Sequence, residues 1–101
     1  MTKENHRIIA EEFAKQLKYL PDSIEDHRWY STLYTDITFN KSPTHWHTRI
    51  RVYNTHLEIQ NIGFSDKVIN NEFHFLDPTS IPKAIEQSNK LIEANYGHTN
   101  A

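Results

Sequence analysis

The chain has 101 residues, a net charge of −2, seven histidines and no cysteine. A chain of this length forms one domain with a single modest core. The lack of cysteine excludes a disulfide scaffold, thiolate zinc sites and a thiol nucleophile, and the near-neutral charge argues against a uniformly basic nucleic-acid binder.

Two amphipathic helices are predicted, one near each end of the chain. Residues 3–20 carry apolar side chains at helical spacing; Thr2 can cap the start, and Pro21 ends the segment because proline forces the residue before it out of the helical region. Residues 82–96 repeat the pattern, with Gly97 suited to the left-handed position after a helix. The apolar stripes consist of Ile8 or Ile9, Phe13, Leu17 and Leu20 in the first helix, and Ile81, Ile85, Leu91 or Ile92, and Tyr96 in the second.

The segment between the helices alternates with a period of two, which indicates strands with one apolar face. Four strands are expected, at residues 29–39, 46–53, 57–62 and 68–76. The residues before them are predicted to form an acidic, solvated turn containing Asp22, Glu25 and Asp26. The inward-facing aromatic side chains are predicted to be Trp29, Phe39, Trp46, Phe73 and Phe75. The resulting fold is a single α+β domain over residues 1–101: an N-terminal helix, a four-stranded antiparallel meander and a C-terminal helix, with both helices on one sheet face.

Loop lengths predict which residues face each other across the sheet. A two-residue turn at Asn54 and Thr55 pairs Arg51 with Glu58, and Arg49 with Gln60, on the outer face. A loop over residues 40–45 pairs Phe39 with Trp46, Asp36 with Arg49, and Tyr34 with Arg51. For the last two strands, the register that opposes Glu58 to His74 is preferred, because the alternative sets Glu58 against Glu72.

The outer sheet face is the predicted binding surface, since both helices are assigned to the other side. Tyrosine and arginine are enriched at binding hot spots, because they bring large area with few rotatable bonds or bidentate hydrogen bonding. A solvated face whose charges are satisfied by cross-strand neighbours is the alternative interpretation. The candidate partner-binding residues are Tyr34, Asp36, His47, Arg49, Arg51, Tyr53, Glu58 and His74.

These features predict a small non-enzymatic protein that binds, and inhibits or regulates, a protein partner. Inhibitors and immunity proteins of phages and mobile elements often have this profile of one compact domain without a catalytic signature. A homodimer covering the same face is a further alternative. No apolar run reaches membrane-spanning length, the first residues lead into a helix rather than a signal peptide, and the absence of cysteine fits a reducing compartment. We therefore expect a cytoplasmic protein without membrane contact.

Other functions remain open from the sequence. The same Arg, Tyr and His side chains are the types that RNA-binding sheets use, so a nucleic-acid-binding module is one alternative. A small metal-independent ribonuclease is another, with Glu58 as base, His74 as acid and Arg51 stabilising the charge of the transition state. His45 and His47 could share a metal ion only with a third ligand from His56, Glu58 or His74, and no metal-binding signature is present. No catalytic residue, metal or cofactor is therefore assigned.

Overall fold

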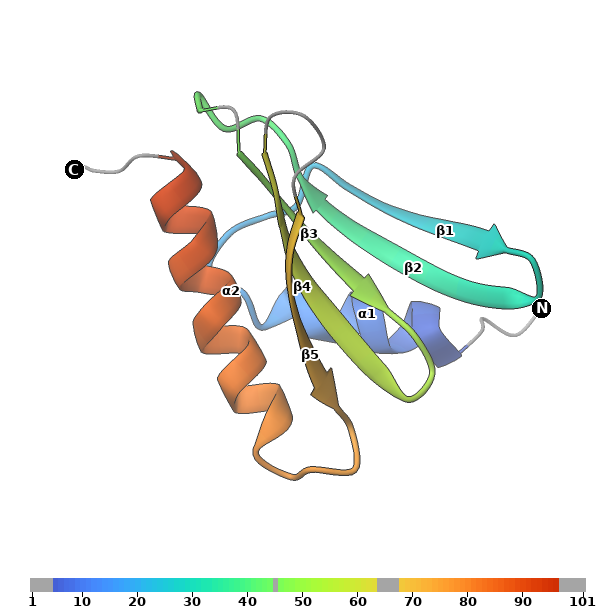
Figure 1. Ribbon diagram of the computed structural model, residues 1–101. Helices are drawn as coiled ribbons and strands as arrows, with labels where there is room; N and C mark the ends of the chain where they lie inside the picture. The colour runs from blue at the N-terminus through green and yellow to red at the C-terminus, as the bar shows by residue number, and fades with distance from the viewer. Residues whose placement is uncertain (1–4, 45, 64–67, 97–101) are drawn as a thin grey trace.

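The computed structural model describes residues 5–44, 46–63 and 68–96. Its sheet has five strands, and each strand pairs antiparallel with the next one along the chain, in the order β1-β2-β3-β4-β5 (Figure 1). The strands are β1 (Ser23–Trp29), β2 (Thr32–Phe39), β3 (His47–Val52), β4 (His56–Ile62) and β5 (Val68–His74). The helices are α1 (Asn5–Lys15) and α2 (Ser80–Tyr96). The predicted α+β order of helix, antiparallel meander and helix is confirmed, with one strand more than expected.

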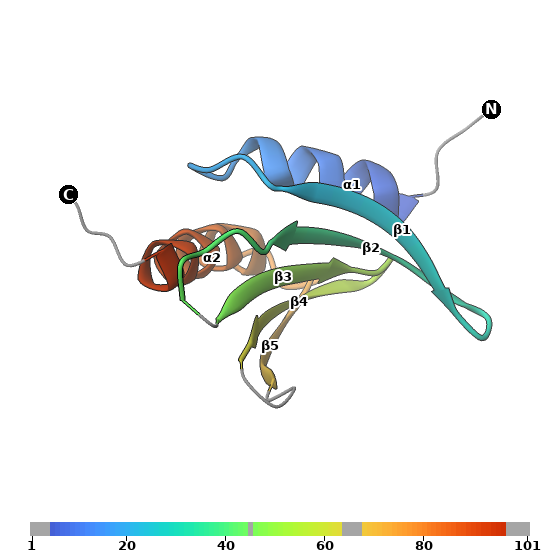
Figure 2. The same ribbon diagram turned by 90° about the horizontal axis from the view of Figure 1, so that it is seen from above.

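Both helices pack on the same side of the curved sheet (Figure 2). The core between them consists of alternating side chains of β2, β3 and β4, such as Ile37, Ile50 and Ile59, together with Phe13 of α1 and Ile92 of α2. The backbone N–H of Lys18, just after α1, donates to Asn89 Oδ1 of α2 at 3.0 Å and ties the two helical ends of the chain together. No helix among the described residues is long and apolar enough to span a membrane.

The additional strand β1 occupies residues that were predicted to form an acidic loop. Glu25 and Asp26 lie within β1, opposite Asp36 and Thr35 of β2. The predicted strand 29–39 is therefore wrong at its start, where Tyr30 and residue 31 form a two-residue turn with Tyr30 at a φ of 56°. The sequence pattern missed β1 because this edge strand is exposed on both sides over most of its length, so that apolar and polar residues do not alternate.

For several apolar side chains near the ends of helices and strands, the predicted inward position is wrong. Trp29 is 66% exposed beside the turn, and Ile69 of β5 is half exposed, although both were predicted to face inward. Helix α1 ends at Lys15, so Leu20 lies in the connection to β1 and is 92% exposed. Phe73 packs against the core as predicted. The predicted caps at Thr2 and Gly97 lie outside the described residues.

The β3–β4 hairpin has the predicted register, whereas the pairing of β2 with β3 is displaced by two residues from the predicted one. Arg51 faces Glu58, as expected, but on its other side it faces Asp36 rather than Tyr34. The cause is a wider loop between β2 and β3. Asp22, which precedes β1, accepts the backbone N–H groups of residues 40 and 41 of this loop. Within the loop, Ser42 Oγ donates to the carbonyl of Trp46. Trp46 consequently lies outside the β2–β3 pairing.

The register between β4 and β5 is the one that the sequence argument rejected. Glu58 lies opposite Glu72, and His56 lies opposite His74. The preference for a Glu58–His74 pair, which was based on charge alone, is therefore wrong. On the inner face this register sets Phe73 against Leu57.

The turn that leads into α2 should respond to pH. Asp77 accepts the backbone N–H of Thr79 at 2.9 Å and its hydroxyl at 2.8 Å, and these hydrogen bonds hold the pKa of Asp77 below its ordinary value. A carboxyl whose pKa is lower in the folded state stabilises the fold above its unfolded pKa, which is about 3.9. This stabilisation is lost as the pH falls through the folded pKa.

We therefore expect Asp77→Ala to melt at a lower temperature than the wild type at neutral pH. The difference should begin to shrink as the pH falls below about 4, and the two melting temperatures should converge below the folded pKa of Asp77, where the wild-type carboxyl is protonated. Thermal unfolding followed by circular dichroism between neutral and acidic pH measures this difference. A gap that stays constant over that range would contradict the assigned role of the Asp77 carboxylate.

Candidate binding face

The sheet face opposite the helices carries the candidate site, and we call it the open face. No described helix covers it (Figure 2). The strand registers arrange its side chains in rows that run across the strands. One charged row contains Glu25, Asp36, Arg51, Glu58 and Glu72. The adjacent polar row contains Ser23, Thr38, Arg49, Gln60 and Asn70.

A third row consists of five aromatic rings, one from each of β1, β2, β4 and β5 and one from the residue after β3. The ring row is formed by His27, Tyr34, Tyr53, His56 and His74. Successive ring centroids are 5.6, 5.6, 4.5 and 5.1 Å apart. These distances are close to the spacing between strands. Three of the four neighbouring pairs are stacked, at interplanar angles of 30°, 19° and 24°, and Tyr34 and Tyr53 are tilted at 49°, so that most of these rings cover part of one another's faces. Their edges are left for contact with solvent or a partner.

Arg51 connects the charged row to the ring row. Its Nε and Nη2 donate to the two carboxylate oxygens of Asp36 at 2.9 and 3.1 Å, and its guanidinium carbon lies 4.2 Å from the centre of the Tyr34 ring. Burial by itself lowers the pKa of Arg51, but the hydrogen bonds and the charge of Asp36 outweigh it, so that the pKa is raised. Arg51 is therefore fixed in place and its charge is neutralised within the face.

Arg49 has the opposite environment. Its Nε donates to Gln60 Oε1 at 2.6 Å, and Gln60 in turn donates to Glu58 at 3.2 Å. Within the described part of the chain, no carboxylate forms an ion pair with Arg49. Burial, followed by the nearby positive charge of Arg51, lowers the pKa of Arg49. Arg49 is thus a half-buried cation without a neutralising partner and would gain from an anion.

Arg49 and Arg51 line a depression of about 470 Å³ on the open face. Four of the five strands contribute residues to it. Their polar groups include a hydroxyl from Thr38 and imidazoles from His27 and His47. Nδ1 of His47 is buried without a hydrogen-bond partner. The depression is therefore a polar site in which the carboxylates of Glu25 and Asp36 match the two arginines in number, although neither carboxylate forms an ion pair with Arg49.

The eight predicted site residues all lie on the open face, but only some of them share the depression. Tyr34, Asp36, His47, Arg49 and Arg51 line it. The other three, Tyr53, Glu58 and His74, lie toward β4 and β5.

Sequence reasoning missed the contributions of His27 and Glu25 to the depression, because β1 was not predicted. It also did not bring together the ring row, in which His56 lies between Tyr53 and His74. The spacing of the histidines along the chain could not reveal this row, since its members come from five different strands or strand ends.

Of two arrangements considered from the sequence, one is not assembled as expected and the other is not tested. His74 approaches Glu72, with 3.3 Å between Nε2 and Oε1, and does not face Glu58 across the strands as the ribonuclease arrangement required. Of the proposed histidine pair, His47 lies in the depression, whereas His45 lies outside the described residues.

Comparisons with known proteins add no identification to this geometry: no family model, no curated protein and no solved structure matches the chain.

Proposed function

We propose that the chain is a binding protein that engages a protein partner through the open face and accepts an acidic side chain of that partner in the depression beside Arg49. The observation that carries this proposal is the half-buried guanidinium of Arg49, which has no ion pair with any described residue. A buried cation without a counter-charge is costly, and an incoming carboxylate would remove this cost.

The open face is also organised before any partner arrives. Arg51 is held by Asp36 and Tyr34, and Gln60 fixes the Nε of Arg49. Side chains that are already ordered lose little conformational entropy on binding, which favours affinity. The terminal nitrogens of Arg49 can then donate to a carboxylate in a defined direction.

The ring row favours a protein over a nucleic acid as the partner. RNA-binding sheets use exposed ring faces on which bases stack. In this chain the rings stand side by side, with Tyr53 and His56 only 4.5 Å apart between centroids, so that their faces cover each other. The charged row also contributes four carboxylates and only one arginine, which would repel a phosphate backbone that extends along the row, whereas a single carboxylate has to approach only Arg49 in the adjacent row.

Replacing Arg49 by glutamine should weaken partner binding by at least about tenfold, because a charge-assisted hydrogen bond contributes about 1.5–3 kcal/mol. Arg28→Gln is the matched control: it removes the same charge from β1 on the other side of the sheet, where Arg28 pairs with Leu33. The partner is first captured from native cell extracts by the wild-type chain and identified by mass spectrometry. The affinities of the three purified chains for it are then compared.

The location of the contact can be tested independently of affinity. A photo-crosslinking amino acid at Thr38, on the rim of the depression, should capture the same partner. The same group at Lys90 of α2, which is exposed on the helical side, should not. Equal affinity of the wild type and Arg49→Gln, crosslinking from Lys90 alone, or recovery of nucleic acid in place of a protein would each overturn the proposal.

A further inference from the structure

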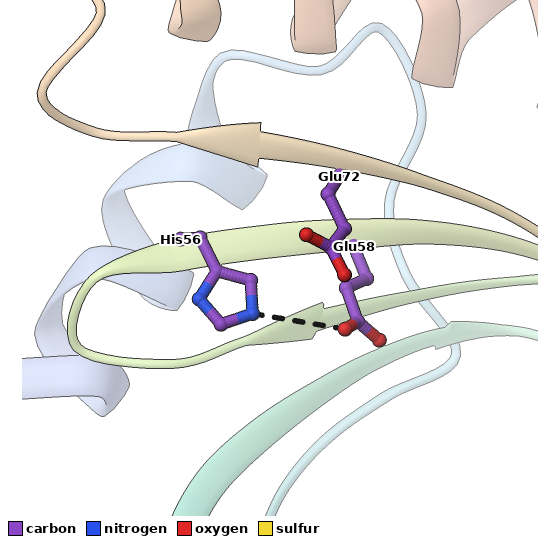
Figure 3. A group of neighbouring side chains, drawn as sticks. All are labelled: His56, Glu58 and Glu72. Carbon is purple, nitrogen blue, oxygen red and sulfur yellow. Dashed lines mark ion pairs between the residues drawn. The ribbon is translucent and has the colours of Figure 1, made fainter.

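Three potential metal ligands meet at the β4–β5 end of the open face. His56 and Glu58 come from β4 and Glu72 from β5, and one ligand atom from each lies within 4.8 Å of the others. Figure 3 shows the imidazole of His56 and the two carboxylates gathered on the same side of the strands. These groups lie outside the depression around Arg49, which is formed by other residues.

The register sets two carboxylates of this cluster against each other, and each has one polar neighbour: Gln60 donates to Glu58 at 3.2 Å, and His74 Nε2 lies 3.3 Å from Glu72 Oε1. Glu58 and Glu72 are directly opposite each other on adjacent strands, and like charges in this position destabilise a sheet. Glu58 is also largely buried, with its side chain 16% exposed, which strengthens the repulsion. The histidine Nε2 of His56 lies 3.6 Å from Glu58 Oε2. A cation between these groups would convert a repulsive arrangement into a favourable one.

The surroundings of His56 suit a metal ligand. Its Nδ1 is 2.9 Å from Thr55 Oγ1, and its ring is held between the rings of Tyr53 and His74. In the tautomer whose Nδ1–H donates to Thr55, the Nε2 lone pair faces the carboxylate of Glu58. Metal-bound histidines generally have their second nitrogen fixed by such a hydrogen bond, which sets both the tautomer and the ring orientation.

We propose that His56, Glu58 and Glu72 bind a divalent transition-metal ion of the Zn²⁺ type. One imidazole nitrogen and two carboxylates form a donor set that Zn²⁺ accepts, with a fourth position left for water or another ligand. Ligand bonds of about 2.0–2.2 Å require the three groups to close by about an ångström. Glu72 can supply this movement, since half of its side chain is exposed. This inference does not depend on the proposed protein partner.

Titration of the full chain with Zn²⁺, followed by isothermal calorimetry, tests the site directly. We expect one ion per chain for the wild type and an affinity at least about tenfold lower for Glu58→Gln and for Glu72→Gln, because even indirect partners of a metal ligand contribute that much. Glu25→Gln and His27→Gln are matched controls on the same face and should bind as the wild type does. Absence of binding in the wild type would overturn the proposal. So would a wild-type affinity for Zn²⁺ in both Glu58→Gln and Glu72→Gln.

A charge-replacement variant separates loss of metal binding from loss of folding. In Glu72→Lys, the lysine ammonium would lie opposite Glu58 and take the place of the ion. This variant should melt at or above the temperature of the metal-free wild type, and Zn²⁺ should no longer raise its melting temperature as it does for the wild type. A rise equal to that of the wild type would show that Zn²⁺ binds elsewhere and would overturn the assignment.

Discussion

Replacing Asp36 by alanine is expected to destabilise the fold by about 2–3 kcal/mol. Asp36 is 5% exposed and is the bidentate partner of Arg51, whose side chain is 21% exposed. Removing one member of a buried ion pair costs about 3–5 kcal/mol, because the other charge is left uncompensated. The loss is smaller here since the guanidinium keeps some contact with water and its position over the Tyr34 ring.

Urea denaturation of the wild type and Asp36→Ala measures this loss. The double variant Asp36→Ala, Arg51→Met is the informative control, because it removes the stranded charge while keeping an apolar chain of similar length. We expect the double variant to be more stable than Asp36→Ala alone. A loss below about 0.5 kcal/mol in the single variant would mean that the pair behaves as an ordinary surface ion pair.

Replacing Gly63 by alanine is expected to cost about 2–3 kcal/mol through overpacking. A Cβ at this position would lie 2.6 Å from Cζ3 of the Trp46 ring, which is too close for two carbon atoms. Either the indole or the end of β4 must move. Because Trp46 directly precedes β3 and Ile62 lies at the edge of the depression, the disturbance should reach the candidate site as well.

A double-mutant cycle tests this explanation. If the ring is the obstacle, Gly63→Ala should cost much less in a Trp46→Leu background than in the wild type, as measured by urea denaturation. If Gly63→Ala lowers the free energy of unfolding by the same amount in both backgrounds, the alanine acts through the backbone conformation and not through contact with the Trp46 ring.

Much of the fold could be predicted from the alternation of apolar residues, because that pattern records which side of each strand is buried. The inward positions of Ile37, Ile50 and Ile59 follow from it directly. The two-residue turn at residues 54 and 55 also set the register of β3 and β4 correctly, since a short turn leaves no freedom. By contrast, β1 carries no such pattern because little of it is buried.

Which residues face each other across neighbouring strands of the open face was harder to predict than which residues lie on that face. A displacement of two residues keeps every side chain on its own side of the sheet, so the apolar pattern does not detect it. The partner of Arg51 on β2 changed from Tyr34 to Asp36 for this reason. The like-charge rule failed at Glu58 and Glu72 because it compares one pair of residues, whereas the register is shared by every pair along the two strands.

The order of the strands also has a consequence for how the chain folds. Each strand pairs with its neighbour along the sequence, so every step of sheet assembly closes a short loop and loses little chain entropy. The contact between Lys18 and Asn89 is different, because it joins positions that are 71 residues apart. We expect the sheet to assemble hairpin by hairpin at a rate typical of chains with local contacts, with the two helical ends meeting only once the strands between them have been ordered.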